Sequence, residues 1–359
     1  MTKNKGILIK NIYYMLSYAF KNLQQNNYES VAAEDFESVQ DLFAAILYKG
    51  TAQQLKQGLH REYIPYNESL VFMRGKIDLP GTIQNRMQRK QRLVCEYDEL
   101  SENNIYNQIL KTTMFYLLQD AEVKKERKAQ LKKLLLFFDS IDPLMPSEIQ
   151  WSRLHFHRNN MNYEMLLNLC YLLLDGMLQT TDKGQYRLAA FSEESMASLY
   201  ERFILEYYQQ EHSYLTQAKA AKIKWDLSDE DIAENKGIRF LPEMQTDTFL
   251  QMNERMLIID AKYYGKTLQN NYEKKTLHSS NLYQIFTYVK NQDKNNTGNV
   301  SGLLLYAKTE EDITPDCSYL LSGNKIGAKT LDLNTDFKTI RAQLDGIVKE
   351  YLCERELHV

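Results

Sequence analysis

The sequence lacks the features that are typical of disulfide-bonded secreted proteins, of proteins with structural metal sites and of membrane proteins. Its 359 residues include only four cysteines, six prolines and two tryptophans. The cysteines are widely separated and form no CxxC pair, which argues against structural zinc and against a disulfide framework. No apolar run approaches the ~20 residues that a membrane-spanning helix needs. We therefore expect a protein of the reducing cytoplasm with no membrane partner.

An excess of positive charge is also missing. Lysine and arginine number 44 against 47 aspartates and glutamates, for a net charge of -3. This excludes a globally basic nucleic-acid coat, although a local basic surface can still exist. There is no P-loop sequence (GxxxxGK followed by Ser or Thr) and no GxSxG, so nucleotide hydrolysis through a P-loop is not expected. At roughly 150 residues per domain, the length indicates about two domains.

The first part of the chain is predicted to be rich in helices. Apolar residues at helical spacing predict helices over 11–23, 38–48, 105–118 and 129–138. Residues 61–96 instead contain short strand-like runs, which predict either a protruding hairpin or a small sheet packed on the helices. Pro143 and Pro146 interrupt the chain, so we place the domain boundary there, between residues 1–150 and 151–359.

The second part is predicted to be a small α/β core. Helices are expected over 163–178, 192–210 and 282–289, and strands over 238–241, 246–250, 255–260 and 302–306. Ser192 is a favoured N-cap residue for the second of these helices. Strands alternating with helices indicate a sheet covered by helices.

The apolar run that ends at Ile259 leads directly into Asp260-Ala261-Lys262. Residues i and i+2 of a strand point to the same face, so Asp260 and Lys262 are expected to share one. Asp247 lies on the preceding predicted strand, and the turn between the two strands is short enough for a hairpin. Paired strands lie about 4.8 Å apart, so both carboxylates could reach one divalent cation.

Two adjacent carboxylates repel unless a cation holds them, and Mg²⁺ prefers hard oxygen ligands. A lysine beside such an ion could stabilise charge on a phosphate or orient the attacking water. The alternative is that an acid, any residue and a lysine occur at the end of a strand by chance. The apolar strand before Asp260 and the acid on the neighbouring strand favour a metal-dependent nuclease site.

Further candidates lie on the flanking helices. Glu201 lies near the apolar stripe of helix 192–210 and could be an acidic ligand or a supporting residue, or a plain surface glutamate. Gln284 on helix 282–289 could hold Lys262 or a phosphate, or have no special role. The basic run Arg86, Arg89, Lys90 and Arg92 could contact phosphates, although such runs are more often solvated loops.

The chain resembles the McrC family, the nuclease subunit of the McrBC modification-dependent restriction system. Matching segments occur along nearly the whole chain: 9–19, 74–77, 224–226, 244–247, 259–264 and 278–284. The resemblance implies a PD-(D/E)xK nuclease, with Asp247, Asp260 and the Ala261 backbone as ligands of Mg²⁺ or Mn²⁺. It also implies catalytic roles for Lys262, Glu201 and Gln284. Thr246 stands where the proline of the motif name would be.

The resemblance further implies partners. McrC-like proteins act with an AAA+ GTPase, a McrB-like hexamer that reads methylcytosine and moves double-stranded DNA. Their N-terminal half forms a stalk that enters the ring and stimulates GTP hydrolysis. Residues 61–96 are our candidate stalk, with Arg74 and Lys76 as candidate stimulating residues. Double-strand cleavage needs two sites, so a second copy of the chain is expected in the active assembly.

These observations predict a mixed α/β protein. Residues 1–150 would form a partner-engaging domain with a β-hairpin stalk, and residues 151–359 a PD-(D/E)xK endonuclease domain. The predicted function is Mg²⁺-dependent cleavage of modified foreign DNA. One alternative is a catalytically idle regulatory or scaffolding subunit that only stimulates the motor. Another is a nuclease that needs no motor, which the balanced charge disfavours because such an enzyme needs its own DNA affinity.

Overall fold

The chain forms two compact units in the computed structural model. Residues 3–4, 7–20, 23, 31, 34–157, 160–175, 193–227, 236–263, 269–271, 274–308 and 314–353 are described. The sheet unit comprises Met1–Leu42 and Phe191–Val359, and the helical unit comprises Phe43–Ala190. The expected boundary at residue 150 therefore lies inside the helical unit, and the first 42 residues group with the C-terminal part. The predicted mixed α/β class is confirmed.

Four long helices form the body of the helical unit. They are α3 (Val39–Gln57), α5 (Ile105–Gln119), α6 (Lys125–Leu135) and α7 (Met161–Asp175), where α3 begins shortly before the unit boundary. Short 3-10 helices follow at Leu136–Phe138, Pro146–Glu148 and Trp151–Arg153. The helix α5 begins where the side chain of Asn104 accepts a hydrogen bond from the backbone of Asn107. The helices predicted in this region are confirmed.

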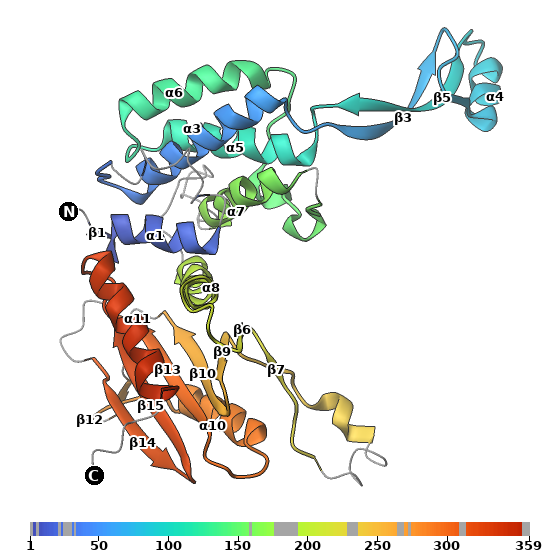
Figure 1. Cartoon of the computed structure of the whole chain (residues 1–359). Helices are drawn as coiled ribbons and strands as arrows, with labels where there is room; N and C mark the ends of the chain where they lie inside the picture. The colour runs from blue at the N-terminus through green and yellow to red at the C-terminus, as the bar shows by residue number, and fades with distance from the viewer. Residues whose placement is uncertain are drawn as a thin grey trace, which may run out of the picture. The chain divides into compact units, whose positions relative to one another are not determined.

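A long β-hairpin is the other part of the helical unit. Strands β3 (Glu62–Leu70) and β5 (Leu93–Ser101) pair antiparallel over their full length, and β4 (Lys76–Ile77) adds to β5. Figure 1 shows α4 (Leu79–Met87) at the far end of this ribbon. Most residues of both strands are exposed or half-buried, so the protruding hairpin is the correct one of the two predicted alternatives.

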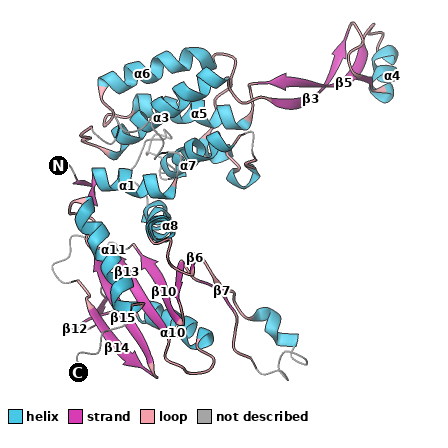
Figure 2. Cartoon of the chain, in the orientation of Figure 1, coloured by secondary structure: helices cyan, strands magenta, loops and turns pink. Residues whose placement is uncertain are grey.

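The sheet unit is built on a six-stranded mixed sheet, coloured magenta in Figure 2. The strand order is β14-β15-β13-β10-β9-β6, in which β10 is parallel to β13 and β13 to β15. The strands are β6 (Gln217–Lys219), β9 (Thr248–Met252), β10 (Arg255–Lys262), β13 (Val300–Ala307), β14 (Cys317–Leu321) and β15 (Asn324–Leu331). Among its described residues, the α-helices are α1 (Ile9–Ala19), α8 (Glu193–Glu211), α10 (Ser279–Gln292) and α11 (Phe337–Tyr351).

Three two-stranded ladders also lie in the described part of this unit. They pair β1 (Lys3–Asn4) with β2 (Ile7–Leu8), β7 (Lys222–Ile223) with β8 (Met244–Gln245), and β11 (Gln269–Asn271) with β12 (Lys274–Thr276). The strand predicted over 238–241 is wrong, because a 3-10 helix covers Lys236–Phe240. Ser192 lies outside the described residues, so its predicted capping role is not seen. None of the helices formed by the described residues is long and apolar enough to cross a membrane.

The face of the sheet that α10 covers holds a core of apolar side chains. Ile258 of β10 and Phe249 of β9 are directly opposite each other and belong to it, together with Ile285 and Val289 of α10. Alternation along β10 puts Asp260 and Lys262 on the same face as Ile258, just beyond this core. The fold therefore leads from a dry core to two charged side chains at the end of β10.

Candidate active site

The candidate site is built on the β9–β10 hairpin. The two strands pair antiparallel from Arg255 opposite Met252 to Ile259 opposite Thr248. A two-residue turn, in which Asn253 has a positive φ of 54°, connects them. Asparagine tolerates this left-handed conformation better than most residues. The predicted hairpin is therefore confirmed, and its register decides which side chains meet.

The structure brings the predicted Asp247, Asp260 and Lys262 together. Asp247 directly precedes β9, and continuing the register by one residue puts it opposite Asp260. The backbone N–H of Ala261 donates a 2.8 Å hydrogen bond to Oδ2 of Asp247. The ammonium Nζ of Lys262 lies 2.8 Å from Oδ2 of Asp260. Asp260 is 2% exposed and the Lys262 side chain 15%, so the pair is shielded from water without being sealed from it.

Glu201 belongs electrostatically to the same cluster. It lies on α8, which packs against β10. Burial raises the pKa of Glu201 to about 7, and the carboxylates of Asp247 and Asp260 add to this rise while Lys262 opposes it. A surface glutamate would not respond to all three groups. Of the two predicted alternatives, the structure therefore favours the one that puts Glu201 at the site.

The acids of the cluster also influence one another. Burial raises the pKa of Asp260 to about 6, where the charge of Lys262 opposes the rise and that of Asp247 adds to it. Burial likewise raises the pKa of Asp247, against the lowering effects of Lys262 and of the Ala261 N–H. One ammonium thus faces three partly buried carboxylates. Such a set of charges is more stable when a further cation is present.

Gln284 lies near this face but has a different partner. Its Nε2 donates a 3.0 Å hydrogen bond to the hydroxyl of Tyr288, one turn further along α10. The start of α10 is nonetheless close to the end of β10, because Asn281 donates to the hydroxyl of Tyr306, the residue paired with Lys262. Sequence reasoning missed Tyr306, because only the β10–β13 register puts it beside Lys262.

The side chains at the site limit which metal ion could bind there. Within the described residues, no group of three or more His, Cys, Asp or Glu side chains is arranged to hold a metal ion. The carboxylates at the site are those of Asp247 and Asp260, with Glu201 electrostatically coupled to them. One or two carboxylates completed by water and phosphate oxygens are typical of protein-bound Mg²⁺. The residues present therefore fit a magnesium ion that is shared with a phosphate.

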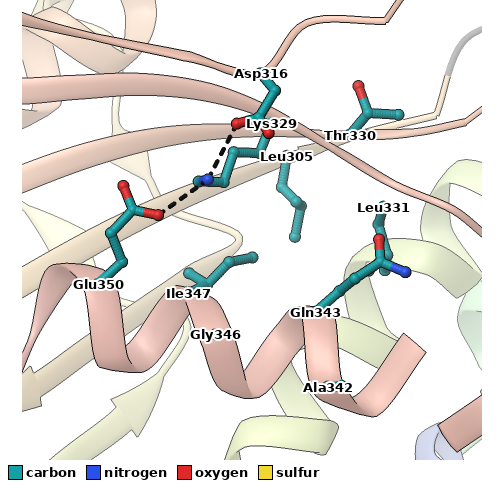
Figure 3. A pocket seen from close by; sticks show the side chains of 10 residues that line it. All are labelled: Leu305, Asp316, Lys329, Thr330, Leu331, Ala342, Gln343, Gly346, Ile347 and Glu350. Atoms are coloured by element: carbon teal, nitrogen blue, oxygen red, sulfur yellow. Dashed lines mark hydrogen bonds and ion pairs between the residues drawn. The ribbon is translucent and has the colours of Figure 1, made fainter. Parts of the chain in front are cut away.

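A separate pocket of about 250 Å³ lies between α11 and strands β13 and β15 (Figure 3). Lys329 crosses it and forms ion pairs with Asp316 at 3.1 Å and Glu350 at 2.9 Å. None of Asp247, Asp260 and Lys262 lines this pocket. Its charges are already paired within the protein, so it has no unpaired charge to offer to a reaction.

Arg74 and Lys76 lie on the hairpin of the helical unit. The guanidinium of Arg74 lies 4.1 Å from the centre of the Tyr97 ring and 3.4 Å from a carboxylate oxygen of Glu99. Lys76 begins β4, opposite Glu96 of β5, and is exposed. The two candidate stimulating residues are therefore close to each other on one folded hairpin.

Fold and site together define an α/β protein with an acidic cluster and a lysine at the end of its central sheet. The sequence matches the family described as McrBC 5-methylcytosine restriction system component over residues 3–307. The chain belongs to this family, and the predicted resemblance to McrC proteins is confirmed.

One curated protein and one solved structure are similar to this chain. The Escherichia coli K12 protein described as type IV methyl-directed restriction enzyme EcoKMcrBC is 29% identical over 350 residues, which cover 96% of this chain and 98% of that protein. A chain in the solved half-complex of Thermococcus gammatolerans McrB AAA+ hexamers with bound McrC is 18% identical, with a TM-score of 0.50. The match covers 94% of this chain and 76% of the other, and shows likeness of fold alone.

Proposed function

We propose that this chain is the endonuclease subunit of a McrBC-like restriction complex, with a site of the PD-(D/E)xK class. The observation that carries the proposal is the convergence of Asp247, Asp260 and Lys262 at the end of the β9–β10 hairpin, with Glu201 coupled to them. The substrate would be a phosphodiester bond of double-stranded DNA. Family membership supports this substrate, because the family is described by its role in 5-methylcytosine restriction.

In the proposed site Asp247, Asp260 and the Ala261 carbonyl would hold Mg²⁺, with Mn²⁺ as a possible substitute. The bound ion would supply charge stabilisation and lower the pKa of a coordinated water. Lys262 is held by Asp260 at 2.8 Å, at the open end of the strand, where its ammonium can meet a phosphate oxygen. Glu201 would orient water or the lysine from the side of α8.

Gln284 has a supporting role in this proposal. Its carboxamide is held by Tyr288, on the helix that covers the face of Asp260 and Lys262. From this position it would help to position Lys262 or the phosphate through the polar groups at the start of α10. Because two strands of DNA must be cut, two copies of the chain would act together in the active assembly.

The partner in the proposal is an AAA+ GTPase that forms a McrB-like hexamer. The solved Thermococcus complex is described as containing such hexamers with bound McrC, and its fold is similar to that of this chain. The β3–β5 hairpin would be the stalk that engages the ring, with Arg74 and Lys76 near the GTPase site. The ring would read the modified base, and this chain would cut.

The test is cleavage of methylcytosine-containing plasmid by the purified chain with its GTPase partner, with GTP and Mg²⁺. Strand scission that is lost in Asp260→Asn and Lys262→Ala, with GTPase stimulation retained, is the expected result. If the unchanged complex hydrolyses GTP but never cuts DNA, the chain is a regulatory subunit and the nuclease proposal fails.

A further inference from the structure

The charges of the hairpin are separated along its length. We define the tip as residues 71–92 and the stem as strands β3 and β5. The tip contains six cationic side chains and one acidic side chain, for a net charge of +5. The stem contains five acidic side chains and no cationic one, for a net charge of -5. A chain whose overall charge is only -3 therefore concentrates positive charge at one end of one hairpin.

The cationic side chains of the tip are available to a ligand. Among the residues that the structure describes, Arg74 alone of these six pairs with an acid, Glu99 of the stem. The other five are exposed, and none of them forms an ion pair within the described part of the chain: Lys76, Arg86, Arg89, Lys90 and Arg92. Exposed like charges repel one another, so this arrangement is costly unless negative charge from outside the chain balances it.

The tip is a folded support rather than an extended loop. Thr82 of α4 exchanges hydrogen bonds with Val94 of β5, and Asn85 donates to Ser69 of β3 at 2.8 Å. Gly75, at φ 65°, lies so close to β5 that a Cβ there would clash with the carbonyl oxygen of Glu96. The cations are thus carried by a helix and a turn that are fixed to the end of the ribbon.

We propose that α4 and the turn after it, the part of the tip that does not include Arg74 and Lys76, form a DNA-contacting surface in which Arg86, Arg89 and Arg92 bind phosphates of duplex DNA. Duplex DNA carries one negative charge per about 1.7 Å and can balance several unpaired cations at once. A protein partner would have to supply an acidic side chain for each. The five acids of the stem repel DNA, so the contact is confined to the tip.

The apolar side chains of the tip agree with this assignment. Leu79, Ile83 and Met87 lie at helical spacing on the outer side of α4 and are 67%, 58% and 81% exposed. Phe72 in the preceding loop is 83% exposed. Proteins that bind the minor groove of DNA often combine arginines with apolar side chains that insert between base steps.

The test measures binding of the full chain to a short fluorescein-labelled duplex by fluorescence anisotropy, in EDTA and over a series of NaCl concentrations. EDTA prevents cleavage, so failure of the nuclease proposal cannot affect the result. The tip variant is Arg86→Gln/Arg89→Gln/Arg92→Gln. The matched control removes three exposed cations of α6, in Lys125→Gln/Lys132→Gln/Lys133→Gln. Circular dichroism checks that both variants are folded.

We expect the tip variant to bind at least about tenfold more weakly than the unchanged chain, with a salt slope shallower by roughly 2 to 3 ions. The α6 control should match the unchanged chain. Equal affinities and slopes for both variants would overturn the proposal, as would the absence of DNA binding by the unchanged chain. Unaltered DNA binding with loss of GTPase stimulation would also overturn it and assign the tip to an acidic protein surface.

Discussion

The backbone N–H of Ala261 donates a 2.8 Å hydrogen bond to the carboxylate of Asp247. This bond ties the residue before β9 to the end of β10, just beyond the last pair, Thr248 and Ile259. Ala261 lies between Asp260 and Lys262 in the sequence. Its N–H therefore holds the carboxylate of Asp247 next to both of these side chains. A register slip of one residue would move Asp247 to the other face of the sheet.

The first prediction concerns Lys262 and Asp260. Lys262→Ala should lower the rate of DNA cleavage at least about hundredfold, because it removes the only cation that faces the cluster's carboxylates in the described structure. Asp260→Asn should have an effect at least as large. The measurement is the rate of plasmid linearisation with the GTPase partner, and GTP turnover should stay unchanged.

A matched control for Lys262 exists in the same unit. Lys308 follows β13 and pairs with Asp332 at 2.8 Å, the same distance as in the Lys262–Asp260 pair. Lys308→Ala should leave cleavage unaltered. If both lysine variants cut at the rate of the unchanged chain, the acidic cluster is a structural ion pair and the reaction takes place elsewhere.

The second prediction concerns Glu201. Glu201→Gln should reduce cleavage by roughly 10- to 100-fold and raise the Mg²⁺ concentration needed for half-maximal rate, because a supporting carboxylate is lost. Glu206→Gln on the same helix is the control and should alter neither quantity. If both variants cut at the rate of the unchanged chain and with the same Mg²⁺ dependence, Glu201 is a surface glutamate with no role at the site.

The third prediction concerns Arg74 on the hairpin. Arg74→Ala should reduce partner-stimulated GTP turnover at least about tenfold, as expected for an arginine at the centre of an interface. Tyr97→Phe keeps the ring beneath the guanidinium and loses only the hydrogen bond to Glu68, so it should retain stimulation. Full stimulation by Arg74→Ala would remove this residue from the interaction, and Lys76→Ala would then be the next variant to measure.

The site was largely predictable from the sequence because its signals are local. The apolar run before Asp260 and the short turn predict the hairpin. The alternation of side chains along a strand predicts that Asp260 and Lys262 point to the same face. The position of Gln284 could not be predicted as finely, because it depends on the packing of α10 and on a hydrogen bond to Tyr288. The position of Tyr306 beside Lys262 depends on the register between β10 and β13, whose paired residues lie more than forty positions apart in the sequence.

Two features of the fold were not predictable from local pattern. Pro80 and Gly81 indicate a turn, yet Pro80 occupies the first turn of α4, where its missing N–H costs nothing. The unit boundary depends on contacts between distant segments. Tyr18 of α1 donates a 2.6 Å hydrogen bond to Glu211 of α8, which is 193 residues away. No composition change near residue 42 marks this grouping.

The fourth prediction concerns the root of the hairpin. The carbonyl oxygen of His60, which precedes β3, accepts hydrogen bonds from the amides of Asn104 at 2.7 Å and Asn107 at 2.8 Å. Asn107 is fully buried and also accepts from the hydroxyl of Tyr163 at 2.9 Å. Asn107→Ala removes the acceptor of the Tyr163 hydroxyl and one of the two donors to the His60 carbonyl, and should destabilise the helical unit by about 1–3 kcal/mol.

The two tryptophans of the chain allow the unfolding of each unit to be followed separately. Trp151 lies in the helical unit and Trp225 in the sheet unit. In a Trp225→Phe background, urea unfolding followed by Trp151 fluorescence should show a lower midpoint for Asn107→Ala. An exposed residue of the same hairpin provides the control, Asn67→Ala, with no expected shift. Equal midpoints would mean that the root does not depend on the asparagine.

The last prediction is a dependence of stability on pH that comes from Asp293. This residue directly follows α10, is 4% exposed, and accepts hydrogen bonds from Thr297, Gly298 and Asn324. Burial raises the pKa of Asp293, but these bonds outweigh it and lower the pKa from 3.8 to about 2. A lowered pKa in the folded state stabilises the protein above pH 4, and this stabilisation is lost as the pH falls from about 4 to about 2.

Asp293→Asn should therefore destabilise the sheet unit at pH 7 by about 1–3 kcal/mol, since an amide puts donors against the N–H groups of Gly298 and Asn324. In a Trp151→Phe background, Trp225 fluorescence reports this unit during urea unfolding. The difference between variant and parent should narrow as the pH is lowered from 4 toward 2. Asp98→Asn, at an exposed position of the stem, should track the parent throughout. A gap that stays constant with pH would show that the loss at Asp293 arises from packing and not from its charge.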